Sequence, residues 1–273
     1  MTRSRSLFNV LGVLVCLVWV FPVYWMVNSA FLTPQQVRSA TPTFVPFGGD
    51  LSAFGRVFDD SFVSSMRLSL VVTFLVVAIA LVFAFLAALA VSRFRFKGRK
   101  GFILTVLIVQ MIPAEGLFIS QYKMLESWSL LNSIAGLSLV YVAMVLPFTV
   151  WMLRGFVEGI PVELEQAAMI DGCGRTRAFF AVTFPLLAPG LVASGVYAFL
   201  QAWNEFTLAT VVMSPSNRTV PLWLRGLTTQ SNAAIDWPGV MAGALLVAVP
   251  VIVFFVIVQN KMTSGLVAGA VKG

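Results

Sequence analysis

The chain has 273 residues, of which 59% are hydrophobic and 11% charged, and its mean hydropathy is +0.93. Soluble domains carry about a quarter charged residues, so this composition predicts a membrane protein. The sequence has no histidine, no GxxxxGK[ST] loop and only two distant cysteines, which excludes Ser-His-Asp hydrolysis, histidine- or cysteine-cluster metal sites and ATP hydrolysis through a phosphate loop.

Long uncharged runs locate the membrane-spanning helices, because a charge at the bilayer centre is costly. About 20 helical residues cross a hydrocarbon core of about 30 Å. Glu115 interrupts the third run, and Pro185 and Pro189 delay the start of the fifth helix, which we expect to run past Glu205. The sequence therefore predicts an all-α, polytopic fold with residues 1–273 in one transmembrane domain. Its six helices are expected at about 7–30, 68–92, 102–121, 134–153, 187–212 and 239–260.

The orientation of these helices follows from lysine and arginine, which favour the cytoplasmic side. The first apolar stretch, Leu7 to Val27, exceeds the roughly 7–15 residues of a signal-peptide core, so we expect a retained helix. With the N-terminus inside, twelve of the 18 basic residues lie in inner segments and six in outer ones. Five inner charges fall within residues 93–100. Both termini are therefore predicted to be cytoplasmic, and the net charge of +7 reflects topology rather than nucleic-acid binding.

The cytoplasmic loop between the fourth and fifth helices, about residues 154–186, carries the signals of a short helix. Pro161 suits a first helical turn, two acidic residues follow where the helix dipole favours them, and Gly172 suits the helix end. We expect a helix over about 161–171, with Gly172 in a backbone conformation that only glycine takes without strain.

A second short helix is expected at about 176–184, ending at Pro185. The spacing alone leaves two interpretations of this loop open. One is a helix resting on the lipid headgroups, and the other is a docking element for a cytoplasmic partner.

The residues Glu165-Gln166-Ala167-Ala168-Met169-Ile170-Asp171-Gly172, followed by Phe184-Pro185, resemble the EAA loop of permease subunits of bacterial ABC importers. Three further segments are similar to the carbohydrate-uptake branch, specifically the maltose-type smaller permease of type I importers with six spans. They are Met111-Ile112-Pro113-Ala114-Glu115, Ala202-Trp203-Asn204-Glu205-Phe206 and the tail 265–273. The resemblance covers nearly the whole chain.

This resemblance implies a multi-pass subunit of the bacterial cell (inner) membrane that lets a sugar enter the cytoplasm by alternating access. It implies a second permease subunit, two ATPase subunits and an extracytoplasmic sugar-binding protein as partners, besides membrane lipid and without nucleic acid. The chain itself is expected to be non-catalytic and to bind no cofactor, with ATP and Mg held by the ATPase subunits.

In the family, the EAA loop is a coupling helix seated on the ATPase, and its glutamate pairs with a basic residue there. Here Gln166 occupies that position and Glu165 precedes it, so Glu165 or Glu163 are alternatives for the ionic contact. Ala168 is small enough for close contact. The residues that the resemblance assigns to ATPase coupling are Glu163, Glu165, Gln166, Ala167, Ala168, Asp171 and Gly172.

Polar groups at membrane depth form a second candidate site. Four residues of the fifth helix are spaced by 3, 4 and 3 positions and share a face, with Glu205 beside them and Trp203 offering an apolar surface. This face either lines a sugar path, joins helices through hydrogen bonds, or lies near the outer interface. Glu115 either belongs to the path or satisfies backbone freed by Pro113. The candidate path residues are Glu115, Ser194, Tyr197, Gln201, Trp203, Asn204 and Glu205.

Two rival functions stay open at the level of sequence. A free-standing carrier or channel would need its own coupling-ion site and usually an internal repeat, which the sequence lacks, although Glu115 and Glu205 are candidates for a proton pair. A membrane-embedded enzyme is disfavoured by the absence of histidine. The sequence does not distinguish a sugar from a related polyol, nor this chain from its partner as the one that contacts substrate.

Overall fold

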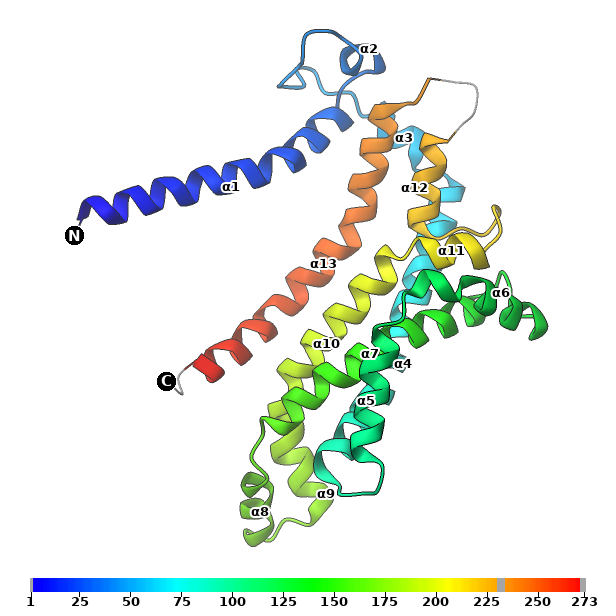
Figure 1. Cartoon of the computed structure of the whole chain (residues 1–273). Coiled ribbons are helices and arrows are strands. Elements are labelled where there is room, and N and C mark those ends of the chain that lie inside the picture. Colours follow the sequence, from blue (N-terminus) through cyan, green and yellow to red (C-terminus); the bar gives the residue numbers. More distant parts are fainter. Residues whose placement is uncertain (1, 230–233, 271–273) are drawn as a thin grey trace. The chain divides into compact units, whose positions relative to one another are not determined.

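Figure 1 shows a computed structural model of the chain, which describes residues 2–229 and 234–270. The described residues form helices joined by turns and loops, without a strand among them, so the all-α prediction is confirmed. The elements in chain order are α1 Thr2–Ala30, α2 Pro34–Val37, α3 Ser52–Val57, α4 Asp60–Arg93, α5 Arg99–Gln110, η1 Ala114–Leu117, α6 Phe118–Ser127, α7 Ile134–Glu158, α8 Glu163–Ile170, α9 Arg175–Ala178, η2 Phe179–Thr183, α10 Phe184–Asn204, α11 Thr207–Val212, α12 Val220–Thr228 and α13 Trp237–Ala270.

Five of the described helical segments are long and apolar enough to cross a membrane. They are Phe8–Ala30, Asp60–Arg93, Ile134–Glu158, Arg175–Asn204 and Trp237–Gln259. A sixth span results if α5 and α6 are counted together, although these two helices meet at an angle of 90°.

The third span thus differs from the continuous helix expected at 102–121. The α5 helix has 12 residues, which at 1.5 Å per residue is roughly 18 Å, well short of a hydrocarbon core of about 30 Å. The break lies at Pro113, whose ψ of 124° is extended. Proline has no N–H to donate to the preceding helical turn and disfavours helical geometry in the residue before it, here Ile112.

The start of the fifth span also differs from expectation, because the helix does not stop at Pro185. Helix α9 continues through the π-helical turn η2 into α10, and Pro185 lies in the first turn of α10. Within this turn the backbone N–H of Phe184 donates to the carbonyl of Phe179, five residues back. A π turn shifts the hydrogen-bond register, and proline in a first helical turn has no N–H bond to lose.

The end of the fifth span is broken as well, whereas a single helix was expected over 187–212. Helix α10 ends at Asn204, Glu205 is extended with ψ of 122°, and α11 begins at Thr207. The Glu205 carboxylate accepts hydrogen bonds from the first-turn amides of Leu208 and Ala209. These bonds satisfy donors that every helix start leaves without an intrahelical acceptor.

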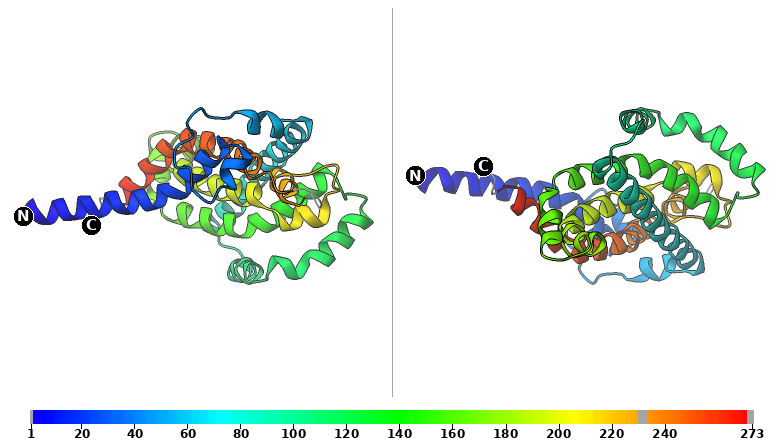
Figure 2. Two further views of the ribbon diagram at one scale, coloured as in Figure 1. Left: turned by 90° about the horizontal axis from the view of Figure 1, so that it is seen from above. Right: turned by 90° about the horizontal axis from the view of Figure 1, so that it is seen from below.

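The chain divides into two compact units, residues 1–66 with 220–250 and residues 67–219 with 251–273. In the second unit, α4, α7 and α10 share one core. Ala84 and Ala88 of α4 meet Leu153 of α7 and Leu187 of α10, and all four are fully buried. Small residues let helix backbones approach closely, as is usual for membrane helices. Both views of Figure 2 show α7 and α10 side by side.

In the first unit, a smaller core joins α3 with α12 and the start of α4. Phe62 packs on Trp223 with ring centroids 4.9 Å apart. Arg56 of α3 bonds Asp236 at 3.0 Å and the Ser52 hydroxyl at 2.7 Å. The Ser52 amide and hydroxyl both donate to the Asp50 carboxylate and lower its pKa. The Arg56–Asp236 pair thereby joins α3 to the residue that precedes α13 on this unit.

Candidate functional site

The short helix expected in the cytoplasmic loop is α8, close to the predicted bounds of 161–171. Its end is a Schellman motif, in which the Cys173 N–H donates to the Ala168 carbonyl at 3.0 Å and the Gly172 N–H to the Met169 carbonyl at 3.1 Å. Gly172 has φ of +91°, in the left-handed region, so the prediction for its backbone is confirmed. In Figure 1, α8 and α9 lie at the end of their unit where the chain turns from α4 into α5.

One face of α8 is exposed and partly apolar. Ile170 is 87% exposed, and Leu164 and Met169 are also exposed. The polar residues on this outer face are Glu163, Gln166 and Asp171, and Ala167 is exposed between them. The face therefore offers both apolar contact area and hydrogen-bonding groups to a partner.

The inner face of α8 carries Glu165 and Ala168, three residues apart and both partly buried. The Thr183 hydroxyl donates to Glu165 Oε1 at 2.6 Å, and Arg93 Nη2 lies 3.7 Å from the same oxygen. Of the two alternatives for the ionic contact, Glu163 lies on the exposed face, whereas Glu165 contacts Arg93 and Thr183 of its own chain. The uncharged Gln166 also lies on the exposed face. Ala168 lies on the inner side.

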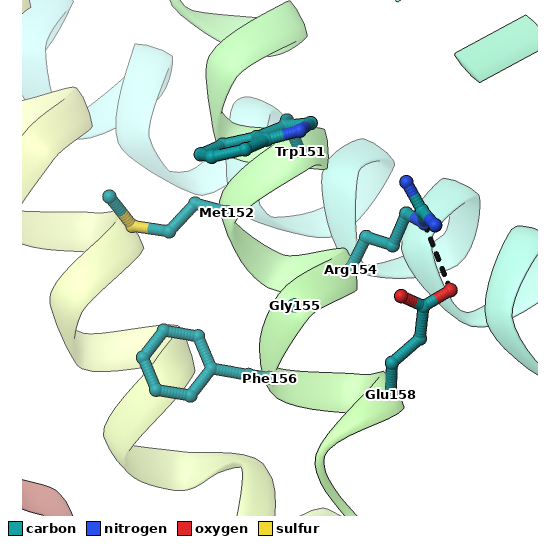
Figure 3. Close-up of a pocket in the computed structure, with 6 residues that line it drawn as sticks. All are labelled: Trp151, Met152, Arg154, Gly155, Phe156 and Glu158. Carbon is teal, nitrogen blue, oxygen red and sulfur yellow. Dashed lines mark hydrogen bonds and ion pairs between the residues drawn. The ribbon is translucent and has the colours of Figure 1, made fainter.

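A concavity of about 400 Å³ lies beside the last turns of α7, close to α8 in sequence (Figure 3). In Figure 3, Met152 and Phe156 point to one side of α7, and Arg154 and Glu158 to the other. Glu158 Oε1 bonds Arg154 at 3.0 Å and Arg99 of α5 at 3.3 Å. This concavity was not predicted from the sequence, although the charged pair Arg154 and Glu158, four residues apart, is a local signal within its lining. The lining residues are Trp151, Met152, Arg154, Gly155, Phe156 and Glu158.

The four polar residues that share a face of α10 lie in different environments. Ser194 is fully buried, Tyr197 is half-buried against the Phe148 ring at 4.4 Å, and Gln201 and Asn204 are exposed. Gln201 Nε2 is 3.5 Å from the Tyr197 hydroxyl. The C-terminal part of this face is therefore open on this chain, whereas Ser194 in its N-terminal part is packed.

Glu205 holds a structural position. Its Oε2 accepts from the Tyr141 hydroxyl at 2.8 Å and from the Ala209 N–H at 3.1 Å, and its Oε1 accepts from the Leu208 N–H at 2.8 Å. Tyr141 is 1% exposed. The carboxylate thus joins α7 to the start of α11, which is the helix-joining alternative of the sequence analysis.

The remaining candidates are Trp203 and Glu115. Trp203 is 2% exposed, and its ring stacks on Phe199 at a centroid distance of 5.8 Å, so it offers no open surface on this chain. Glu115 is exposed on η1, at the break of the third span. Within the described residues no hydrogen bond joins Glu115 to Glu205.

Comparison with known proteins gives matches over nearly the whole chain. Residues 1–262 match the family described as binding-protein-dependent transport system inner membrane component. The diacetylchitobiose uptake system permease protein DasC of Streptomyces coelicolor is 42% identical, covering 99% of this chain and 100% of that protein. The trehalose transport system permease protein SugB of Mycobacterium tuberculosis is 31% identical and covers 99% of each chain.

A solved structure agrees with these matches in fold. The crystal structure of a bacterial ABC transporter involved in the import of the acidic polysaccharide alginate contains a chain with a TM-score of 0.79 and 22% identity. The match covers 95% of this chain and 98% of that one.

Proposed function

The chain belongs to the family of binding-protein-dependent transport system inner membrane components, and from this membership we propose that it is the permease subunit of an ATP-driven importer that carries a sugar into the cytoplasm. The relatives named above for diacetylchitobiose and trehalose support a sugar as substrate. The chain itself forms part of the sugar path and couples movement of the ATPase subunits to its membrane helices. ATP and Mg are held by two partner ATPase subunits.

The exposed outer face of α8 is the observation that carries the ATPase-coupling part of this proposal. A short helix between two spans, with Ile170 87% exposed and polar groups around it, fits a complementary cleft better than water. Gln166 lies on this face and donates or accepts hydrogen bonds there, in place of the acid that the family carries.

The second permease and the membrane lipid share the apolar surface of the spans. Along α1 the side chains of residues 8–24 are exposed, and most of them are apolar. The exposed Gln201 and Asn204 face the sugar path, opposite the second permease. An extracytoplasmic sugar-binding protein delivers the substrate. A proton-coupled carrier finds no support in Glu205, because its carboxylate is engaged by Tyr141 and two backbone amides.

Co-purification and uptake test this function. We expect the chain, expressed with its neighbouring permease, ATPase and binding protein, to purify with ATPase in stoichiometric amount. The complex in proteoliposomes should import diacetylchitobiose, trehalose or a related sugar only with ATP and the binding protein. Uptake by the chain alone, driven by a proton gradient, would establish the carrier instead.

Labelling of single cysteines tests the orientation on which the proposal depends. Cys16 and Cys173 are free and are first replaced by serine. Cysteines at Lys97 and Asp171 should react only from the cytoplasm and one at Asp50 only from outside. Lys272 and Ser231, expected inside and outside respectively, lie outside the described residues. Outside labelling at position 171 would contradict ATPase docking on α8.

A further inference from the structure

Building on the proposed function, we propose that Glu165, Arg93 and Thr183 form an internal anchor that holds the inner face of α8. In this arrangement Glu165 is a positioning residue within its own chain rather than a contact to the ATPase. A displacement of α8 by a partner bound to its outer face is then transmitted to two helices. These are the end of α4, which carries Arg93, and the start of the fifth span, which carries Thr183.

The anchor has three contacts that converge on α8. Thr183 Oγ1 donates to Glu165 Oε1 at 2.6 Å, a short distance typical of a hydroxyl bonded to a carboxylate. Arg93 Nη2 lies 3.7 Å from the same oxygen, which is an ionic contact. The same Nη2 donates to the Ile160 carbonyl at 3.0 Å. Arg93 therefore holds both the chain entering α8 and the first turn of α8 itself.

Burial separates this pair from ordinary surface ion pairs. The side chains of Arg93 and Glu165 are 13% and 19% exposed, and Thr183 is fully buried. Exposed pairs contribute little because water and salt screen them, whereas a removed partner in a buried pair leaves an uncompensated charge. The hydrogen bonds of this junction therefore resist movement more than surface contacts would.

The two attachment points belong to the packed part of the unit. Phe85 of α4 contacts the rings of Phe179 and Phe184, at centroid distances of 6.1 and 6.0 Å. Ile160 belongs to the core that α4, α7 and α10 share. Because Thr183 closes the π turn η2, its hydrogen bond ties α8 to the one turn of this span whose backbone register differs from an α-helix.

Three substitutions separate the contacts of the anchor. Glu165→Gln keeps an oxygen for Thr183 but removes the charge that faces Arg93. Thr183→Val keeps the shape but removes the hydroxyl, and Thr183→Ser restores it. Glu163→Gln is the matched control, because it removes the same charge from the exposed face of the same helix.

The first measurement is hydrogen exchange of the α8 amides in the full chain in lipid nanodiscs, which does not depend on transport. A hydrogen bond to a charged group changes an opening equilibrium by on the order of tenfold or more. We expect exchange in α8 to accelerate by about that factor in Glu165→Gln and Thr183→Val. It should change far less in Glu163→Gln, whose charge interacts with the helix dipole but with neither anchor residue. It should return towards the original rate in Thr183→Ser.

The second measurement is sugar imported per ATP hydrolysed by the complete importer in proteoliposomes. We expect Glu165→Gln to retain bound ATPase but to lower this ratio several-fold, and the double variant Glu165→Gln with Arg93→Gln to lose no more than the larger single loss. Arg93→Lys keeps the positive charge, so its ratio of sugar to ATP should be higher than that of Arg93→Gln.

Three results would overturn the anchor. They are unchanged α8 exchange in Glu165→Gln, loss of bound ATPase in that variant with α8 still protected, and faster exchange with an unchanged ratio of sugar to ATP. Failure of the proposed function would appear instead in the unmodified chain, which would then bind no ATPase. The exchange measurement would still decide whether the anchor exists.

Discussion

The junction between α10 and α11 depends on one carboxylate, and its removal is the most informative single change. Glu205→Leu deletes the acceptor of three hydrogen bonds, from the Tyr141 hydroxyl and from the amides of Leu208 and Ala209. The Tyr141 hydroxyl keeps a second acceptor, the carbonyl of residue 205 at 3.3 Å. Two amides of buried residues are therefore left without the acceptor that they now have.

The size of the effect follows from these two amides. A buried donor without an acceptor costs about 1–3 kcal/mol, so the variant should lose about 2–6 kcal/mol of stability. Glu205→Gln keeps one acceptor oxygen, so its stability should lie between that of Glu205→Leu and that of the original chain.

Thermal unfolding of the complex in detergent, together with the amount of assembled importer, measures this effect. We expect Glu205→Leu to lower both the melting temperature and the yield of the complex. Any loss of uptake in this variant would then follow from the loss of stability. Asn204→Leu is the matched control, because Asn204 is exposed and its side chain bonds only the Leu200 carbonyl among the described contacts. A Glu205→Leu complex that melts normally but imports no sugar would refute this reasoning and make Glu205 a path residue.

Three further changes test other parts of the structure. Gly190→Ala places a Cβ 2.5 Å from the Phe156 ring and should lower the free energy of unfolding by about 1–3 kcal/mol. Adding Phe156→Leu should restore part of this stability, and equal losses with and without Phe156→Leu would contradict a direct clash. In Gly172→Ala the new Cβ meets open space, but the residue must keep φ of +91°. This substitution should lower the free energy of unfolding by about 1–2 kcal/mol and accelerate hydrogen exchange at the end of α8, and Gly172→Asn should lower it less. Equal exchange in the original chain and both variants would show that this backbone position is not strained. Gln201→Leu should lower sugar uptake with normal assembly, because Gln201 is exposed on the polar face of α10; unchanged uptake would place the path elsewhere.

The broken third span changes how Glu115 is interpreted. The sequence places this acid inside a continuous apolar run, where a functional role is the default. In the structure it lies on η1, directly after the extended Pro113, and is exposed. The following helix α6 ends at Ser127 and is followed by Trp128, and Tyr122 and Lys123 are exposed along it, a composition typical of a membrane interface.

The sequence by itself determined the class of fold, the approximate positions of most spans and the short helix between α7 and α10. These features depend on local properties, namely the length of apolar runs, the cost of charges in lipid, and the preference of Gly172 for positive φ. Such properties act through neighbours in the chain, so one sequence is sufficient to read them.

Only the tertiary structure decided what the charged and polar residues do. Glu165 and Gln166 are adjacent polar residues in the sequence, yet Glu165 meets Arg93 and Thr183 and Gln166 stays exposed, because a step of one residue turns a helix by about 100°. Glu205 likewise finds Tyr141, 64 positions away. Which partner a carboxylate meets depends on how the helices pack. Helix packing is set by contacts between residues that are distant in the chain, and a single sequence does not reveal these contacts.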